Sequence, residues 1–203
     1  MRKLSIITSA ALGLLVWANF ASAQVFTLTS ESFQNNQNQL PLSMIFTRNE
    51  NGVNVCTKDG SFSSENKSPQ LTWTNAPTST TSFVVIVTDL TAAAIHWGMY
   101  NIAGNTTQLP QDAGVAGSRF GQMVNNDVDG TPAYAGPCPP QNRTPNVHQY
   151  RFAVYALSTT LNLPSSANFP ANSITLYRAL FREAREGRIL NAASIEGNYS
   201  ATP

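Results

Sequence analysis

The run SFVVIVTD, from Ser82 to Asp89, is apolar at every position from Phe83 to Val87. A strand with one face in water alternates apolar and polar residues, and this run does not. It therefore predicts a central strand that is buried on both faces of its sheet. A chain built around such a strand is expected to fold as a β-rich domain.

Shorter stretches on either side also have a strand pattern. Alternating or clustered apolar residues predict strands over 40–47, 53–56, 95–102 and 150–157, with shorter ones around Trp73 and in the tail SIEGNYS. Strict alternation over 95–102 predicts two faces, one with Ile95, Trp97 and Met99 and the other with His96, Tyr100 and Ile102. Residues 103–147 are rich in Gly, Pro, Asn and Asp and predict a long loop region, which is a frequent place for function.

One segment near the C-terminus has helical periodicity. Its apolar positions are Ile174, Tyr177, Leu180, Phe181 and Ala184, and charged residues occupy the intervening positions. Asn172 or Ser173 suits the start of this helix, and Gly187 suits its end. The pattern predicts a mainly β single domain with a C-terminal helix.

The first residues have the layout of a secretory signal peptide. Arg2 and Lys3 precede an apolar stretch, and Ala21-Ser22-Ala23 fits a signal-peptidase site. The sequence therefore predicts a signal peptide over 1–23, a domain over 24–203, and export to the periplasm or the medium. An uncleaved membrane anchor is the alternative, but the apolar stretch is short for a span. After cleavage no transmembrane segment is expected.

Cysteine count and charge narrow the class of protein further. Cys56 and Cys138 are the only two cysteines, and in an exported chain such a pair predicts one disulfide, with two buried thiols as the alternative. Charged residues make up 11% of the chain and the formal net charge is +1. This composition gives no electrostatic footprint for nucleic acid or for an anionic membrane.

Several proton-handling side chains are expected at one end of the sheet. Asp89 ends the central strand and His96 follows after a short connection, which would bring both to the same end. His148 and Tyr150 share one face of a later strand because the strand period is two. The stiff segment GPCPP, residues 136–140, would form a wall beside them. The alternative is that each histidine is simply packed at a strand end.

The ordered motifs HWGMYNI, GPCPP and HQYRFAVYAL, with KSPQLTWTNAP before them and EGRILNAASIEGNY after, resemble the phosphatidylethanolamine-binding protein family. The resemblance is to its bacterial, Raf-kinase-inhibitor-like branch and covers most of residues 56–199. It implies a β-sandwich with a large antiparallel sheet, a smaller sheet and a C-terminal helix. It also implies an anion-binding pocket at one end of the large sheet.

Carried over by position, the family's ligand-binding residues fall on Asp89, His96, Gly136, Pro137, Pro140, His148 and Tyr150. The segment Asp89–Ala93 reads DLTAA where many members have Asp-Pro-Asp-Ala-Pro, so a more open rim is expected here. Asp89 is expected to raise the pKa of His96.

The resemblance implies a non-enzymatic protein without a cofactor. Its ligand would be a phosphate or a phospholipid headgroup, and regulation or inhibition of an unidentified protein is a further role. The alternative hypothesis is a metal-dependent or acid–base hydrolase that uses Asp89, His96 and His148.

Overall fold

The computed structural model describes residues 24–166 and 168–202. The predicted signal peptide, residues 1–23, lies outside the described residues. No helix in the described part of the chain is both long enough and apolar enough to cross a bilayer.

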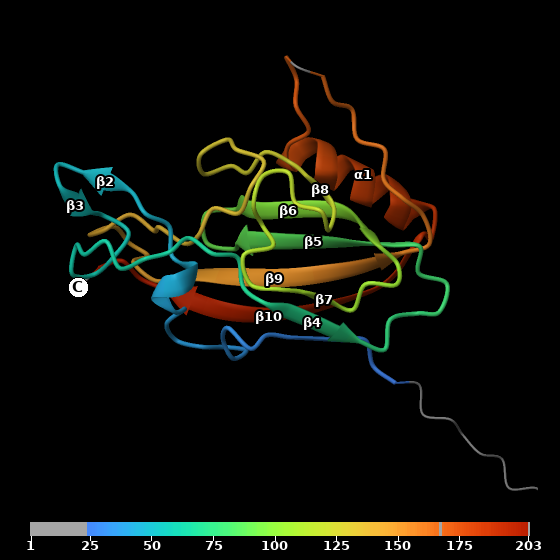
Figure 1. Ribbon diagram of the computed structural model, residues 1–203, viewed down its shortest axis with the longest axis horizontal. Coiled ribbons are helices and arrows are strands. Elements are labelled where there is room, and N and C mark those ends of the chain that lie inside the picture. Colours follow the sequence, from blue (N-terminus) through green and yellow to red (C-terminus); the bar gives the residue numbers. More distant parts are fainter. Residues whose placement is uncertain (1–23, 167, 203) are drawn as a thin grey trace, which may run out of the picture.

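Within residues 24–166 and 168–202 the fold consists of ten strands, one short 3-10 helix and one α-helix (Figure 1). In chain order they are β1 (Thr27–Thr29), η1 (Leu42–Met44), β2 (Asn49–Glu50), β3 (Val53–Asn54), β4 (Leu71–Thr74), β5 (Ser82–Asp89), β6 (Ala94–Ala103), β7 (Gln108–Leu109), β8 (Gln122–Met123), β9 (His148–Leu157), α1 (Ser173–Arg185) and β10 (Ile189–Tyr199).

The large sheet has five antiparallel strands in the order β10-β9-β5-β6-β8. The central strand predicted from SFVVIVTD is β5, and its residues from Phe83 to Val87 are all buried. Both of its neighbours contribute to this burial, because Val87 pairs with Trp97 of β6 and with Phe152 of β9. The prediction of a central, fully buried strand is confirmed.

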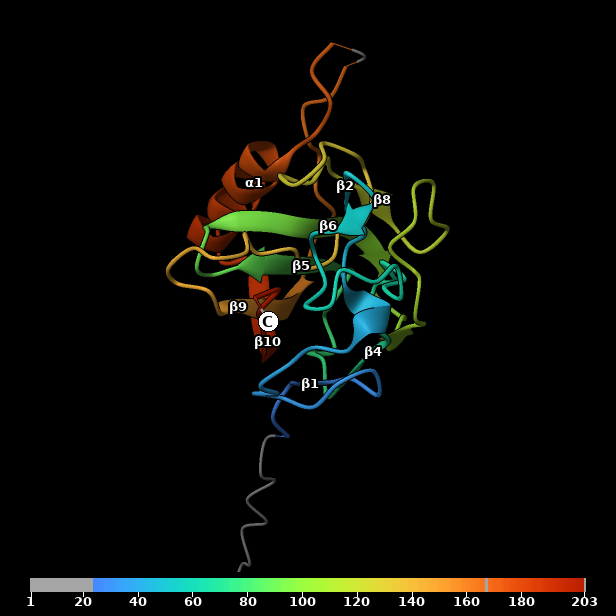
Figure 2. The same ribbon diagram turned by 90° about the vertical axis from the view of Figure 1, so that its left-hand side faces the viewer.

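Two layers cover the two faces of this sheet (Figure 2). A three-stranded sheet, β1-β4-β7, packs on one face, and α1 packs on the other. The core between the two sheets contains Leu28, Leu71, Trp73, Phe83, Val85, Met99, Phe152 and Val154. A second core, under α1, contains Val84, Ile86, Tyr100, Leu176 and Leu180. The predicted fold, a mainly β sandwich with a large sheet, a smaller sheet and a C-terminal helix, is confirmed.

The helix α1 has the predicted extent but a different buried face. Asn172 caps its start, because its side chain accepts a hydrogen bond from the backbone N–H of Thr175, and Gly187 follows its end at φ +66°. Of the predicted stripe only Leu180 is buried, and it is joined by Leu176, Ala179 and Glu183, while the other four members of the stripe are exposed. The reason is that the sequence offers apolar residues on two sides of the helix, and the sheet covers only one.

The strand predicted over 40–47 is wrong. Leu42–Met44 forms a 3-10 turn, and the backbone of this segment bonds to two loops instead of a strand ladder. Phe46 N–H donates to the carbonyl of Pro137 (3.2 Å), and the carbonyl of Ser43 accepts from Lys67 N–H (2.8 Å). In this segment the alternation of apolar and polar residues reflects packing between loops and not a strand.

The strict alternation predicted for 95–102 is also wrong, because β6 contains two bulges. Its pairing with β5 shifts once between Phe83 and Val85 and again between Val87 and Thr88. Each bulge adds one residue to β6, which exchanges the faces of the residues that follow. Trp97, Met99 and Ile102 therefore face the small sheet, while Ile95 and Tyr100 face α1.

Candidate functional site

Asp89 is the anchor of a polar cluster at one end of the large sheet. It is the last residue of β5, and only 3% of its surface is exposed. One carboxylate oxygen, Oδ1, accepts hydrogen bonds from the backbone N–H groups of Thr91 (2.8 Å) and Ala92 (2.9 Å). The other, Oδ2, lies 2.7 Å from Nδ1 of His148, the first residue of β9. The turn after β5 therefore fixes the carboxylate, and the carboxylate orients the imidazole.

His96 enters the same cluster through the second bulge of β6. It is the extra residue between Ile95, which pairs with Thr88, and Trp97, which pairs with Val87. Its Nδ1 donates to the carbonyl of Ala135 at 2.7 Å, since a carbonyl can only accept. Its Nε2 lies 4.0 Å from Asp89 Oδ2.

The environment of His96 reverses one prediction from the sequence. Asp89 was expected to raise the pKa of His96, but burial disfavours the charged imidazolium and lowers this pKa below its ordinary value. The carbonyl of Ala135 and the charge of Asp89 oppose the shift without cancelling it. The direct hydrogen-bond partner of Asp89 is His148, and His96 is neutral near pH 7.

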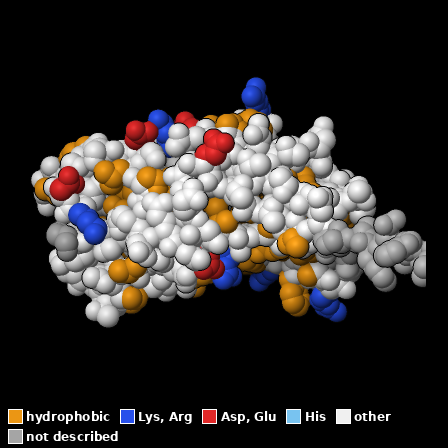
Figure 3. Space-filling model, turned by 90° about the horizontal axis from the view of Figure 1, so that it is seen from below, with side chains coloured by type: hydrophobic (Ala, Val, Ile, Leu, Met, Phe, Trp, Pro, Cys, Tyr) orange, Lys and Arg blue, Asp and Glu red, His pale blue; other side chains and the backbone are white. Residues whose placement is uncertain are grey.

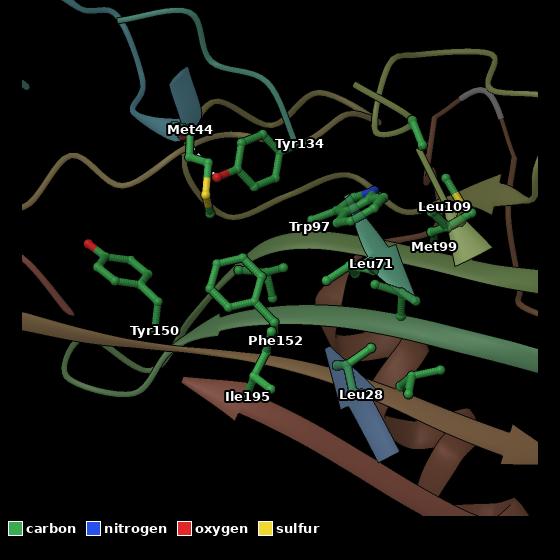
Figure 4. Close-up of a cluster of buried hydrophobic side chains, with 14 of the residues drawn as sticks. Leu28, Met44, Leu71, Trp97, Met99, Leu109, Tyr134, Tyr150, Phe152 and Ile195 are labelled. Carbon is green, nitrogen blue, oxygen red and sulfur yellow. Dashed lines mark hydrogen bonds between the residues drawn. The ribbon is translucent and has the colours of Figure 1, made fainter. Parts of the chain in front are cut away.

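Tyr150 lies between the two imidazoles. Its ring meets that of His96 edge-on, with centroids 5.2 Å apart, and lies nearly parallel to that of His148 at 6.5 Å. Burial first, then the charge of Asp89 and a weak interaction of the hydroxyl with that carboxylate, raise the pKa of Tyr150, so the phenol keeps its proton. The interaction with Asp89 is too long or too poorly aligned to be a hydrogen bond. Its buried hydroxyl has no hydrogen-bond partner among the described residues and points away from the core side chains in Figure 4.

Gly136 and Pro137 form a wall next to this cluster. The backbone N–H of Gly136 donates to Asn66 Oδ1 (2.7 Å), and the preceding carbonyl, of Ala135, holds His96. The predicted disulfide is formed one residue further on, between Cys138 and Cys56, with their Cα atoms 4.6 Å apart. The wall is thus attached to two other loops.

Pro140 is the one predicted site residue that the structure does not bring to the cluster. It is exposed and lines a separate hollow of about 450 Å³, together with Arg48 and Arg143. A second hollow, of about 420 Å³, lies between β1 and β10. Neither hollow includes a residue of the Asp89 cluster, whose members are each less than 10% exposed.

The metal-binding triad of the alternative hypothesis is not assembled. Asp89 directs one oxygen at two backbone amides and the other at His148, so three of its four lone-pair sites are already used. Within the described ranges, no group of three or more His, Cys, Asp or Glu side chains is placed to hold a metal ion. The cluster is instead arranged to position two imidazoles and a phenol around one carboxylate.

Some groups that build the site were not predicted from the sequence. They are backbone groups, such as the carbonyl of Ala135 and the amides of Thr91 and Ala92, and a distant side chain, that of Asn66. An aspartate that accepts from the amides two and three residues ahead is a common turn, so the local contacts of Asp89 had a sequence signal. The contacts of Ala135 and Asn66 had none.

The comparisons with known proteins agree with one another and cover most of the chain. The family model for phosphatidylethanolamine-binding protein matches residues 29–200. A UPF0098 protein of Methanothermobacter thermautotrophicus is 34% identical over 139 residues, which is 66% of this chain and 83% of that protein. The UPF0098 protein YbcL of Escherichia coli is 32% identical over 81% of this chain and 84% of its own length. The crystal structure of YbcL, described as a new member of the mammalian PEBP family, superposes with a TM-score of 0.65 and 28% identity, covering 86% of this chain and 98% of that one.

Proposed function

This chain belongs to the phosphatidylethanolamine-binding protein family, and from its Asp89 cluster we propose that it is an exported binding protein for a small phosphate-type anion. The ligand would be a phosphate monoester or the headgroup of a phospholipid. It would contact His96, His148 and Tyr150, with Gly136 and Pro137 as one wall. No chemical step is part of this function.

The buried hydroxyl of Tyr150 carries the proposal. A buried polar group without a hydrogen bond costs about 1–3 kcal/mol, so native proteins rarely keep one without a use. The other two buried tyrosines of this core do have partners, because the hydroxyl of Tyr134 donates to the carbonyl of Met44 at 2.9 Å (Figure 4) and that of Tyr199 donates to the carbonyl of Cys56 at 2.8 Å. An anionic oxygen bound near His148 would give Tyr150 its missing acceptor.

The two imidazoles support the same reading. Each uses Nδ1 for a protein contact, to Asp89 or to Ala135, so each leaves Nε2 for a ligand. Neither Nε2 takes part in a hydrogen bond within the described part of the chain. Two ring nitrogens and one hydroxyl in one cluster suit the several oxygens of a phosphate group.

The held carboxylate favours binding over hydrolysis. A general base must be free to reach a water or a substrate hydroxyl, and Asp89 is engaged by two amides and one imidazole. In this arrangement Asp89 orients the imidazole of His148. This is the task of a residue that shapes a binding site.

Two matched tyrosine variants test the proposal. Tyr150→Phe removes the unpartnered hydroxyl and is expected to weaken phosphoethanolamine binding about tenfold to a hundredfold, the range of one hydrogen bond to a charged group. The same change should leave the free energy of unfolding unchanged or slightly higher, because no hydrogen bond of the free protein is lost. Calorimetric titration and urea unfolding measure the two effects.

Tyr134→Phe is the control with the opposite signature. It removes the hydrogen bond to Met44 and is expected to cost about 1 kcal/mol of stability while ligand affinity stays the same. If Tyr150→Phe binds phosphoethanolamine as tightly as the wild-type protein does, the ligand does not reach this hydroxyl and the proposed site is wrong.

The same titration with phosphoethanolamine, carried out at pH 6 and at pH 8, tests whether ligand binding requires a proton. His96 is neutral in the free protein and its Nε2 can only accept, so a phosphate oxygen there must bring a proton or place one on the ring. Asp89, His148, Tyr150 and Asp127 are the titratable groups around this ring. The complex then holds more protons than its separated parts, so affinity should fall as the pH rises from 6 to 8. Equal affinity at both pH values would contradict this proton requirement.

Export is the remaining part of the proposal, and it rests on the layout of residues 1–23. Cleavage after Ala23 would leave Gln24 as the first residue, just before β1. Intact-mass measurement of protein from the periplasm or medium of the producing cells is expected to give a chain that starts at or near Gln24. Material that still contains Met1–Ala23 would contradict export by this route.

A further inference from the structure

The outward side of α1 carries large apolar side chains that nothing in the structure covers. Ile174 is 58% exposed, Tyr177 is 45% exposed and Phe181 is 66% exposed. These three residues belong to the stripe that the sequence assigns to the core, and the sheet packs against the other side of the helix. A helix that buries one apolar face and exposes another is unusual for a surface helix, which normally has a polar outer face.

Arginines stand among these apolar residues. Arg178, Arg182 and Arg185 are exposed on α1, and only Arg182 is paired with an acid, Glu183. Arg178 and Arg185 make no ion pair with any residue in the ranges 24–166 and 168–202. In a chain whose formal net charge is +1, this is a local excess of positive charge.

The surface continues beyond the helix. Phe169, 79% exposed in the segment before α1, lines a hollow of about 550 Å³ together with Ile174 and Arg178. At the other end, Phe181 and Arg185 line a hollow of about 340 Å³. We call the set Phe169, Ile174, Tyr177, Arg178, Phe181 and Arg185 the arginine–aromatic face. The opposite side of the molecule, seen in Figure 3, has scattered charges among uncharged groups.

We propose that the arginine–aromatic face docks on the surface of an anionic lipid bilayer. Aromatic and aliphatic side chains on one side of a helix can enter the boundary between headgroups and acyl chains while arginines bind lipid phosphates. The net charge of the chain gave no sign of such a surface, because the acids that balance these arginines lie elsewhere in the fold.

A second copy of the chain fits this face less well than a bilayer does. A two-fold dimer buries the same patch of both copies. In such a dimer Arg178 and Arg185 of one protomer would lie near the same two arginines of the other. No unpaired acid in the patch would compensate these like charges. Glu186, which lines the same hollow as Phe181 and Arg185, is already engaged by Arg188. A bilayer that contains anionic lipid supplies both the missing negative charge and an apolar layer.

Lipid docking here does not depend on the proposed ligand site. The arginine–aromatic face lies on the α1 side of the large sheet, whereas Trp97, Tyr150 and Phe152 belong to the core on the other side. The two functions therefore succeed or fail separately.

The proposal can be tested by vesicle co-sedimentation. The protein is isolated from its own cells, and its N-terminus is determined by mass spectrometry. The wild-type protein is expected to bind vesicles of phosphatidylcholine mixed equally with phosphatidylglycerol, and to bind phosphatidylcholine alone much more weakly. Replacing Arg178 and Arg185 by Gln should weaken binding about fivefold for each arginine. Phe181→Ser should weaken binding to the anionic vesicles as well, and raised salt should weaken that of the wild-type protein.

A matched control removes the same charge elsewhere. Arg119 and Arg143 are exposed in loops away from α1, and their double replacement by Gln should leave vesicle binding unchanged. Equal loss in this control, or equal binding of the wild-type protein to both kinds of vesicle, would overturn the proposal. A concentration-dependent dimer that the Arg178 and Arg185 replacements dissociate would also overturn it, in favour of self-association.

Discussion

Loss of the Cys56–Cys138 disulfide is expected to lower the free energy of unfolding by about 4 kcal/mol. The bond closes a loop with a sequence separation of 82 residues, and the chain-entropy model gives an effect of this size for such a loop. Cys56→Ala, Cys138→Ala and the double replacement should have similar effects, because the same bond is lost in all three. Denaturant unfolding under oxidising conditions measures these free energies.

The wild-type protein provides the control for this experiment. A reductant added during unfolding should lower the stability of the wild-type protein towards that of the double variant and leave the double variant unaffected. Because Cys138 directly follows the wall formed by Gly136 and Pro137, the double variant should also bind phosphoethanolamine more weakly. A wild-type protein that is insensitive to reductant, with two titratable thiols after denaturation, would show that the bond does not form.

Gly136→Ala is expected to cost about 3 kcal/mol of stability. A Cβ atom at this position would lie 2.0 Å from the carbonyl oxygen of Met44 and 2.6 Å from the backbone N of Phe46. These are backbone atoms of a tight crossing, so no side-chain rotation can relieve the overlap and the two segments must separate. The hydrogen bond between Phe46 and Pro137 would be lost with them. The carbonyl of Ala135 would shift too, so His96 should lose its orientation and the ligand its affinity.

Gly117→Ala is the matched control for this change. Gly117 has a φ of +73°, and a Cβ there would have nothing within 4 Å. The replacement should cost only about 1 kcal/mol, the strain of a left-handed conformation, and should leave ligand binding unchanged. Urea unfolding and calorimetric titration of both variants distinguish the cost of backbone strain, expected at Gly117, from the cost of steric overlap, expected at Gly136. Equal stability of the two variants would mean that the wall can move aside freely.

The sequence predicted the parts of the fold that follow from local pattern. The central strand β5, the strand β9 and the extent of α1 were each predicted from apolar periodicity and capping residues. The sequence predicted that Asp89, His96 and His148 lie at one end of the sheet, but the direct bond of Asp89 to His148 depends on the pairing of β5 with β9, which was not predicted. The predicted pairing of the only two cysteines, Cys56 with Cys138, is also found.

What the sequence could not predict depends on contacts between distant segments. The strands β1, β7 and β8 have only two or three residues each, too few to show any period. The buried face of α1 was wrong because a helix with apolar residues on two sides does not reveal which side meets the sheet. The bulges of β6 depend on register with β5, which no single-strand pattern encodes. The pKa of His96 depends on the packing that follows from that register.

The bulge at His96 has a consequence for how such a site can arise and disappear during evolution. The pairs on either side of it, Thr88 with Ile95 and Val87 with Trp97, are both kept, so the extra residue is accommodated between two ladder pairs by a local bulge. Loss of a single codon here would restore a regular strand and remove an imidazole from the cluster while keeping the sheet. A lineage could therefore gain or lose this histidine in one genetic step, without first rebuilding the domain that carries it.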